Sequence, residues 1–143
     1  MIVVDTNVLV YLHMQTPWTA AAERLLRRDG DWAAPVLWRS ELRNVLAAQV
    51  ARRTITLDHA LAIQSEAEDL LSGNEYEVQS RAVLELAARS GCSAYDCEFV
   101  ALAESLRVKL FSADKEVLEA FPKVAARLPA AKKKAGPASR ARF

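Results

Sequence analysis

Two short apolar segments of the chain each end in an aspartate. Residues 1–4 lead into Asp5, and residues 108–111 lead through Ser112 to Asp114. Apolar runs of this kind are typical of strands that are buried on both faces of a parallel sheet. Open α/β sheets form their sites where strands end, so the two carboxylates are predicted to meet at one edge of the sheet.

Two further acids are placed to join this pair. Glu41 and Asp96 each lie near the start of a predicted helix. Helices that follow parallel strands begin at the edge where the strands end, so all four acids are predicted to converge there. Glu98 and Glu116 are weaker candidates, because each lies two residues beyond one of these acids and projects from nearly the opposite side of its helix.

A cluster of four carboxylates indicates a cation site. Close pairs of negative charges in a low-dielectric cleft repel by several kcal/mol, so the cluster requires protons or a cation. Hard oxygen ligands without Cys or His favour Mg²⁺ or Mn²⁺ over zinc. One or two such ions polarise a phosphodiester and lower the pKa of an attacking water. Thr6, Asn7 and Ser112 add hydroxyl and amide groups that can hold ligands or a phosphate.

Helix capping is the alternative explanation for each acid taken alone. Asp5 and Asp114 are suited to N-cap positions. Asp96 can close a capping box that Ser93 opens, and Glu41 can complement the dipole in the first turn of its helix. Capping explains a single acid of this kind more often than a site does. Two aspartates that end apolar strands, with two more acids near helix starts, favour a shared site.

Short strands and helices alternate along the chain. Apolar periodicity and turn residues predict strands at residues 1–4, 32–35, 75–78, 108–111 and 124–128. They predict helices at residues 8–12, 17–28, 37–53, 57–71, 83–90, 94–106 and 114–120. Thr16 is the predicted N-cap of the second helix, and Tyr95 is predicted to join the buried stripe of the sixth. The alternation predicts parallel strands with right-handed crossovers, covered by helices on both faces.

Length and composition fit one cytoplasmic domain. The 143 residues are 52% hydrophobic, enough for a core and too apolar for disorder. No apolar run approaches the roughly 20 residues of a membrane span, and no signal peptide is expected before the first strand. Cys92 and Cys97 match neither a redox pair nor a zinc site and are expected to stay reduced. His13 and His59 are interpreted as structural or surface residues.

The net charge of +1 conceals a basic C-terminal tail. Residues 130–143 contain five basic residues and no acid, whereas the rest of the chain contains 14 basic and 18 acidic residues. The domain is predicted to span residues 1–128, followed by a disordered tail at residues 129–143. Such a tail either adds nonspecific attraction to a polyanion or serves only solubility.

Four segments resemble the motifs of PIN-domain nucleases. They are Val4-Asp5-Thr6-Asn7, Glu41-Leu42-Arg43-Asn44, residues 95–103 around Asp96, and Leu110-Phe111-Ser112-Ala113-Asp114. The first motif alone is weak, but the four together are specific and occur in the family's order across about residues 1–125. Within the family, the chain looks like the VapC-type toxins of bacterial toxin–antitoxin pairs.

The resemblance implies a Mg²⁺- or Mn²⁺-dependent endoribonuclease that cleaves RNA phosphodiesters by metal-activated water, leaving 5′-phosphate and 3′-hydroxyl ends. It implies a catalytic and metal-binding cluster of Asp5, Glu41, Asp96 and Asp114, supported by Thr6, Asn7 and Ser112. It implies a PIN-like three-layer α/β/α fold with a parallel sheet of about five strands. It also implies a homodimer or a larger toxin–antitoxin assembly, silenced by an antitoxin whose C-terminal segment enters the active-site groove. Ser112 stands where many relatives have Thr, a change that keeps the hydroxyl.

Three other functions remain open from the sequence. A housekeeping PIN-type RNA-processing or DNA-directed nuclease would use the same acids, although a short domain without an RNA-binding appendage favours the toxin. An aspartyl-nucleophile phosphatase also begins with a strand and an Asp, but its chemistry requires a second Asp where this chain has Asn7. A non-catalytic binding module would use the acids only as caps. Four arginines share the predicted helix with Glu41 and could flank an RNA groove, but they are assigned no role: Arg39, Arg43, Arg52 and Arg53.

Overall fold

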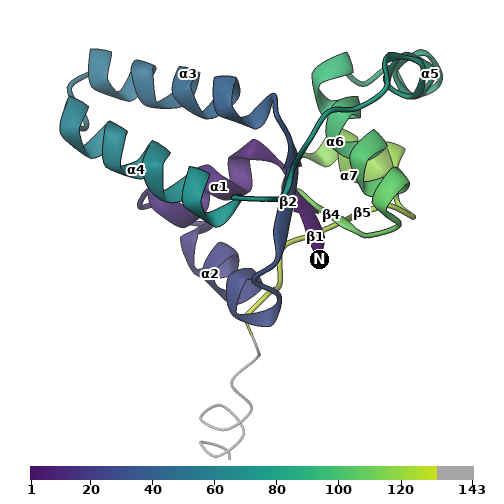
Figure 1. The fold of residues 1–143 in the computed structure, drawn as a ribbon. Coiled ribbons are helices and arrows are strands. Elements are labelled where there is room, and N and C mark those ends of the chain that lie inside the picture. Colours follow the sequence, from purple (N-terminus) through teal and green to yellow (C-terminus); the bar gives the residue numbers. More distant parts are fainter. Residues whose placement is uncertain (132–143) are drawn as a thin grey trace, which may run out of the picture.

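Five short strands form one parallel sheet in the computed structural model, which describes residues 1–131 of the chain (Figure 1). The strands are β1 (Ile2–Val4), β2 (Trp32–Pro35), β3 (Glu75–Tyr76), β4 (Leu110–Phe111) and β5 (Ala125–Ala126). Their order in the sheet is β3-β2-β1-β4-β5, which puts β1 in the centre. All five strands lie at their predicted places, and all except β2 are shorter than predicted.

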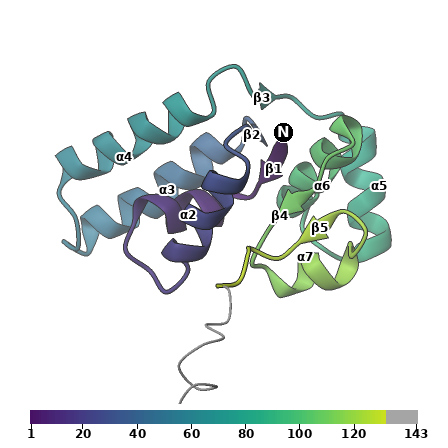
Figure 2. The ribbon, with the colours of Figure 1, turned by 90° about the horizontal axis from the view of Figure 1, so that it is seen from below.

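Seven helices surround this sheet within residues 1–131. They are α1 (Thr6–His13), α2 (Thr19–Arg28), α3 (Trp38–Ala51), α4 (Leu57–Leu70), α5 (Ser80–Ser90), α6 (Ala94–Leu106) and α7 (Lys115–Ala120). Seen from below, α1 to α4 lie on one side of the sheet and α5 to α7 on the other (Figure 2). The predicted three-layer α/β/α fold is therefore confirmed. Most of the predicted basic tail, residues 132–143, lies outside the described residues.

The core forms where the central strands meet α6. Val3 and Val4 of β1 have no exposed surface, and neither do Ala33 and Ala34 of β2. Helix α6 packs across β1, β2 and β4, and its Val100 is likewise fully buried. Burial of aliphatic side chains contributes roughly 25 cal/mol per Å², so this contact stabilises the two strand ends that carry the predicted acids.

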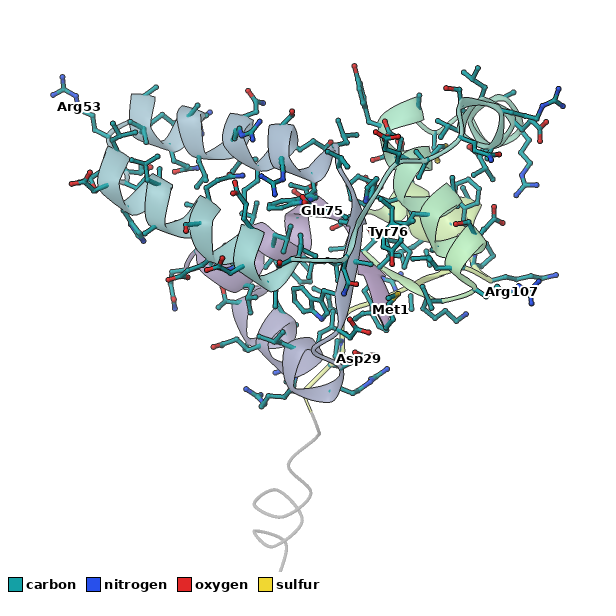
Figure 3. All side chains as sticks on the ribbon, viewed as in Figure 1. Met1, Asp29, Arg53, Glu75, Tyr76 and Arg107 are labelled. Carbon is teal, nitrogen blue, oxygen red and sulfur yellow. The ribbon has the colours of Figure 1, made fainter. Side chains whose placement is uncertain are left out.

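Helices α3 and α4 form an antiparallel pair that projects from the sheet. Arg53, just beyond α3, lies at the far tip of the pair, while Glu75 and Tyr76 lie at its base (Figure 3). Arg39 ties the base together, because its guanidinium donates to Glu75 at 2.6 and 2.9 Å and pairs with Glu68 of α4 at 3.2 Å. The pair is therefore anchored to the β3 edge of the sheet.

Two local predictions are wrong. Tyr95 is 63% exposed, because it lies in the first turn of α6 and the burial of that helix begins at Cys97. Thr16 is not the N-cap of α2, which begins three residues later. The Thr19 hydroxyl donates to the Met14 carbonyl at 2.7 Å, so a side chain closes the loop before the helix starts.

None of the helices in the described part of the chain combines the length and the apolar character that a bilayer crossing requires. Cys92 and Cys97 are free thiols and both are buried, as expected for reduced cysteines that pack as small apolar groups.

Candidate active site

The four predicted acids line one pocket of about 200 Å³. It lies at the carboxyl ends of β1 and β4, where α1 and α7 begin and where α3 and α6 also begin. No lysine or arginine lines it. The lining residues are Asp5, Thr6, Asn7, Glu41, Asn44, Val45, Asp96, Phe99 and Asp114. We call this hollow the acidic pocket. The predicted convergence of four acids is thus present in the structure.

Asp5 lies between β1 and α1 and uses both carboxylate oxygens. Oδ1 accepts the Val8 N–H at 3.1 Å, which caps α1, and Oδ2 accepts a hydrogen bond from the Ser112 hydroxyl. Burial raises the pKa of Asp5 to about 6, and the charges of Asp114 and Asp96 add to this rise against the two hydrogen bonds. The effect of burial on the pKa of Asp5 is therefore only partly offset by its two hydrogen bonds.

Asp114 is the N-cap of α7, the helix that follows β4, and β4 lies beside β1 in the sheet. Its Oδ1 accepts the Glu116 N–H at 2.8 Å and the Val117 N–H at 3.3 Å. Its own N–H donates to Ser112 Oγ at 3.0 Å, so Ser112 links the two strand-terminal aspartates. Capping, the alternative explanation, is therefore correct for Asp5 and Asp114, but it does not exclude a site because both residues still line the acidic pocket.

Glu41 reaches the acidic pocket from the first turn of α3. The Thr6 hydroxyl donates to its Oε1 at 2.7 Å, which joins α1 to α3. Burial raises the pKa of Glu41, the negative charge of Asp96 raises it further, and the Thr6 hydrogen bond opposes both. The Thr6 hydroxyl therefore fixes the position of one carboxylate of the pocket.

Asp96 reaches the acidic pocket from the first turn of α6. Ser93 caps that helix, because its Oγ accepts the Asp96 N–H at 3.1 Å. Burial raises the pKa of Asp96, and the charges of Asp114 and Glu116 act in the same direction, against the Ser93 hydroxyl. Glu116 and Glu98, the weaker candidates, are not among the lining residues of the acidic pocket. Glu116 nevertheless contributes to the negative field around Asp96.

Sequence reasoning missed two residues near the acidic pocket. Asn44 lines it, and the signal was available because Asn44 lies three residues after Glu41 on the same face of α3. Tyr11 of α1 lies within electrostatic reach, since burial raises its pKa and the charges of Asp5 and Asp114 raise it further. The predicted supporting residue Asn7 lines the pocket, with an exposed side chain.

The donor set of the acidic pocket fits a hard divalent cation. Carboxylate, amide and hydroxyl oxygens are the ligands that Mg²⁺ and Mn²⁺ prefer. Burial is the main cause of the raised pKa values of Asp5, Glu41 and Asp96, and neighbouring carboxylates raise these pKa values further, while no lysine or arginine lines the pocket. Within residues 1–131, no three His, Cys, Asp or Glu side chains already have the arrangement of a metal cage. The carboxylates would therefore have to draw together around an ion.

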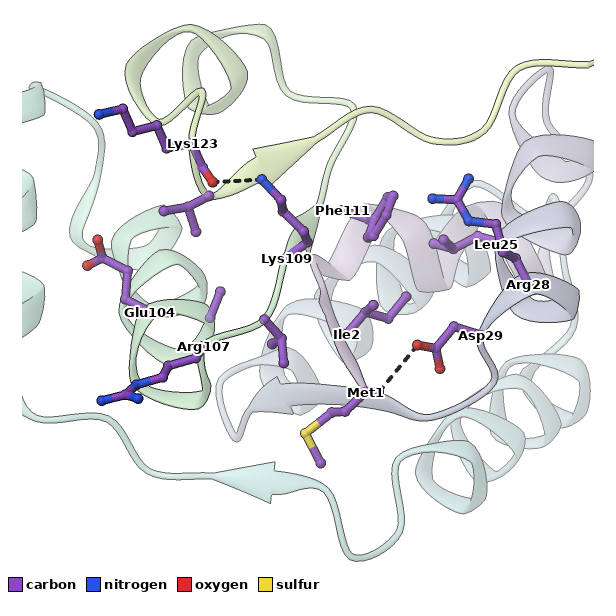
Figure 4. A pocket seen from close by; sticks show the side chains of 13 residues that line it. Met1, Ile2, Leu25, Arg28, Asp29, Glu104, Arg107, Lys109, Phe111 and Lys123 are labelled. Carbon is purple, nitrogen blue, oxygen red and sulfur yellow. Dashed lines mark hydrogen bonds and ion pairs between the residues drawn. The ribbon is translucent and has the colours of Figure 1, made fainter.

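A larger cavity of about 650 Å³ lies at the opposite edge of the sheet, near Met1 (Figure 4). The Met1 amino group pairs with Asp29 at 3.3 Å, and the Lys109 ammonium group donates to the Lys123 carbonyl at 2.7 Å. None of the four predicted acids lines this cavity. Size alone therefore does not identify the site, and the convergence of functional groups selects the smaller acidic pocket.

Comparison with known proteins identifies the family. A family model described as the PIN domain matches residues 2–126, a span that contains all four acids. The chain belongs to the PIN-domain family. Ribonuclease VapC3 of Pyrobaculum aerophilum is similar to this PIN domain, with 27% identity over 124 residues that cover 85% of this chain and 95% of the relative.

Solved structures share the fold of this PIN domain. The crystal structure of PAE2754 from Pyrobaculum aerophilum matches with a TM-score of 0.70 at 21% identity, over 88% of this chain and 82% of that chain. A toxin–antitoxin complex from Klebsiella pneumoniae matches with a TM-score of 0.65 at 15% identity, over 88% of this chain and 96% of that chain. The resemblance inferred from four short motifs therefore extends to the whole domain.

Proposed function

We propose that the chain is the toxin component of a toxin–antitoxin pair and acts as a Mg²⁺- or Mn²⁺-dependent endoribonuclease. The acidic pocket is the observation that carries this proposal, because four carboxylates meet there with no lysine or arginine in the lining. Membership of the PIN-domain family supports a nuclease. Similarity to a relative named as a ribonuclease supports RNA as the substrate.

The chain's own groups account for how the acidic pocket would work. Unaided, its carboxylates would repel a phosphodiester, so Asp5, Glu41, Asp96 and Asp114 would have to hold a divalent cation before RNA binds. Such a cation, when bound, would neutralise the phosphate and lower the pKa of the attacking water. Hydrogen bonds from Ser112 and Thr6 already orient two of the carboxylates, which reduces the reorganisation that cation binding requires. The exposed amide of Asn7 offers a donor to a phosphate oxygen.

Cleavage of RNA by the purified chain tests the nuclease, with Asp96→Asn as the variant. Asp58→Asn is the matched control, because Asp58 is also a first-turn helix acid but lies exposed on α4, outside the acidic pocket. We expect Asp96→Asn to lower Mg²⁺- or Mn²⁺-dependent cleavage by at least about 100-fold and the control to cleave as wild type. Wild-type cleavage rates for Asp96→Asn in both metals would disprove the proposal.

A binding measurement separates the cation from the reaction. Mn²⁺ should raise the thermal midpoint of the wild-type chain, because a ligand that binds only the folded state stabilises it. The same addition should raise the midpoint of Asp58→Asn equally and that of Asp96→Asn much less. An equal rise in all three proteins would show that Mn²⁺ binds outside the acidic pocket.

The proposal of an antitoxin partner is based on a second surface, the apolar groove between α3 and α4. This cavity of about 500 Å³ is lined almost entirely by apolar side chains, and its Leu57 and Leu61 are 62% and 60% exposed. Clustered exposed leucines are typical of protein interfaces. The similar structure from Klebsiella pneumoniae is a toxin–antitoxin complex, which supports an antitoxin as the occupant.

We also propose that the chain forms a homodimer. The mass of the purified chain in solution would test this proposal.

Expression in a bacterial host tests the toxin. The chain alone should arrest growth, and co-expression of the small protein encoded beside it should relieve the arrest. The Asp96→Asn variant should be harmless at equal abundance. Harmless expression of intact chain that cleaves RNA in vitro would retain the nuclease and reject the toxin in favour of an RNA-processing enzyme.

A further inference from the structure

The loop between α1 and α2 presents an exposed tryptophan. Trp18 is 50% exposed, whereas the other two tryptophans, Trp32 and Trp38, have no exposed surface. The Trp18 ring lies 5.9 Å from the ring of Tyr11, centroid to centroid, with an angle of 33° between the planes. Contact with the Tyr11 ring restricts the movement of the Trp18 ring, while half of the Trp18 surface stays exposed to a ligand.

Trp18 also lines a hollow of about 290 Å³ beside the acidic pocket. Ser112 lines this hollow from the end of β4, and its hydroxyl bonds Asp5, which lines the acidic pocket. The two hollows therefore adjoin across Ser112 and Asp5, along the same carboxyl edge of the sheet. We call this second hollow the Trp18 hollow.

The charges of the two hollows are opposite. The acidic pocket is lined by four carboxylates, whereas the Trp18 hollow has no acid in its lining and includes Arg24 and Arg127. Arg24 Nε donates to the Pro129 carbonyl at 3.0 Å. The Arg127 side chain is exposed and forms no ion pair with any of residues 1–131. An aromatic face beside the exposed guanidinium group of Arg127 suits a nucleotide, which offers a base and a phosphate.

The backbone around Trp18 is held before any ligand arrives. The Trp18 N–H donates to Thr16 Oγ1 at 3.1 Å, and the Trp18 carbonyl accepts the Ala22 N–H at 3.0 Å. The Thr19 hydroxyl, bonded to the Met14 carbonyl, closes the same loop. A platform that is already ordered loses little conformational entropy on binding, which favours the bound state.

We propose that Trp18 is a stacking platform for the base of the nucleotide next to the scissile phosphodiester, with Arg127 contacting that nucleotide's phosphate. This inference rests on the proposed nuclease function and adds a substrate subsite to it. The acidic pocket takes the scissile phosphate, and the Trp18 hollow takes the neighbouring nucleotide of a single-stranded RNA. Every base has a π-face, so the subsite tolerates different bases and requires that the base be unpaired.

Tryptophan fluorescence reads this contact directly. A short single-stranded RNA with uncleavable backbone linkages is titrated with Mg²⁺ into the wild-type chain, whose acidic pocket is intact. Because Trp32 and Trp38 are buried, quenching by a stacked base reports on Trp18. We expect the emission to fall on binding and to stay constant in Trp18→Leu. The affinity of Trp18→Leu for the labelled RNA should be about 5- to 100-fold weaker than that of wild type.

Kinetics on the cleavable RNA give the second readout. Trp18→Ala should raise KM by about 5- to 100-fold with a smaller change in kcat, and Trp18→Phe should restore most of the loss because phenylalanine also stacks. The matched control is Leu84→Ala, which removes a side chain that is 63% exposed on α5. A second RNA carries an abasic nucleotide beside the cut. Wild type should bind this RNA more weakly than the intact RNA, whereas Trp18→Ala should bind the two RNAs equally well.

The outcomes separate this inference from the nuclease itself. If Trp18→Ala binds and cleaves RNA like wild type while Asp96→Asn does not cleave, the stacking subsite is wrong and the nuclease stands. If Asp96→Asn cleaves like wild type, the proposed function fails first. If Trp18→Ala does not fold, Trp18→Phe and the abasic RNA test the subsite instead. The inference of a stacking subsite is then overturned if wild type binds the abasic and the intact RNA with equal affinity.

Discussion

The Ser112 hydroxyl donates to Asp5 Oδ2 and joins the ends of β4 and β1 across a separation of 107 residues. Ser112 is fully buried, and its oxygen also accepts the Asp114 N–H at 3.0 Å. One hydroxyl group therefore fixes the positions of Asp5 and Asp114, and both residues still line the acidic pocket. The hydrogen bond also lowers the pKa of Asp5, against the larger effect of burial, and so favours the ionised form that a cation requires.

Ser112→Ala should make the nuclease more sensitive to acid. Without the donor, the pKa of Asp5 rises above its value of about 6, so more of the protein is protonated there at neutral pH. The acid limb of the cleavage rate against pH should move to higher pH, and the free energy of unfolding should fall by about 1 kcal/mol. Ser112→Thr keeps the hydroxyl and should keep the wild-type limb. An unshifted limb in Ser112→Ala would mean that this hydrogen bond does not tune Asp5.

Without metal, the chain should become more stable as the pH falls from 7 to about 5. Burial places the pKa of Asp5 at about 6, against an ordinary 3.8, so the folded chain binds more protons than the unfolded chain in this window. Stability therefore falls as the pH rises through the window, by about 1 kcal/mol for Asp5 alone. Burial raises the pKa values of Glu41 and Asp96 too, which acts in the same direction.

Urea unfolding in EDTA at pH 5 and pH 7 measures this effect. Asp5→Asn should show a smaller difference between the two pH values than wild type, because the variant lacks the main buried acid. A wild-type chain that is less stable at pH 5 than at pH 7 would contradict the predicted sign.

Local rules predicted the elements that carry the acids. The apolar run before Asp5 and the run before Ser112 indicated buried parallel strands, and both are present beside each other in the sheet. Ser93 was predicted to open a capping box and does cap α6. These predictions succeeded because burial on both faces and N-cap chemistry each act over a few adjacent residues.

Contacts between distant residues could not be read from the sequence in the same way. Supporting roles were predicted for Thr6 and Ser112, but not that the Thr6 hydroxyl binds Glu41 or that Ser112 joins both strand-terminal aspartates. The helix predicted at residues 17–28 included Trp18, whereas the structure places Trp18 before α2 because hydrogen bonds in the loop delay the start of that helix. Each of these depends on how α1 and α2 pack, which no local pattern specifies.

Thr6→Val should weaken cleavage without unfolding the chain. Valine keeps the shape of threonine but cannot donate to Glu41 Oε1, a bond of 2.7 Å in the structure. The freed carboxylate loses its fixed orientation, so we expect cleavage to fall by about 10- to 100-fold. Thr6→Ser retains a donor and should retain most of the activity. The prediction fails if Thr6→Val cleaves RNA at the wild-type rate both at a saturating and at a limiting concentration of Mn²⁺.

Leu61→Glu should separate antitoxin binding from catalysis. Leu61 is 60% exposed in the apolar groove between α3 and α4, so a charge there would be tolerated in the free chain but unpaired and desolvated under a partner. We expect cleavage of RNA at the wild-type rate and at least about 10-fold weaker binding of the antitoxin, which would leave growth arrest unrelieved. Leu84→Glu is the matched control, because Leu84 is 63% exposed but lies on α5, on the other side of the sheet. If both variants bind the antitoxin like wild type, the groove is not its docking surface; if both lose binding, the effect is one of added charge and not of the groove.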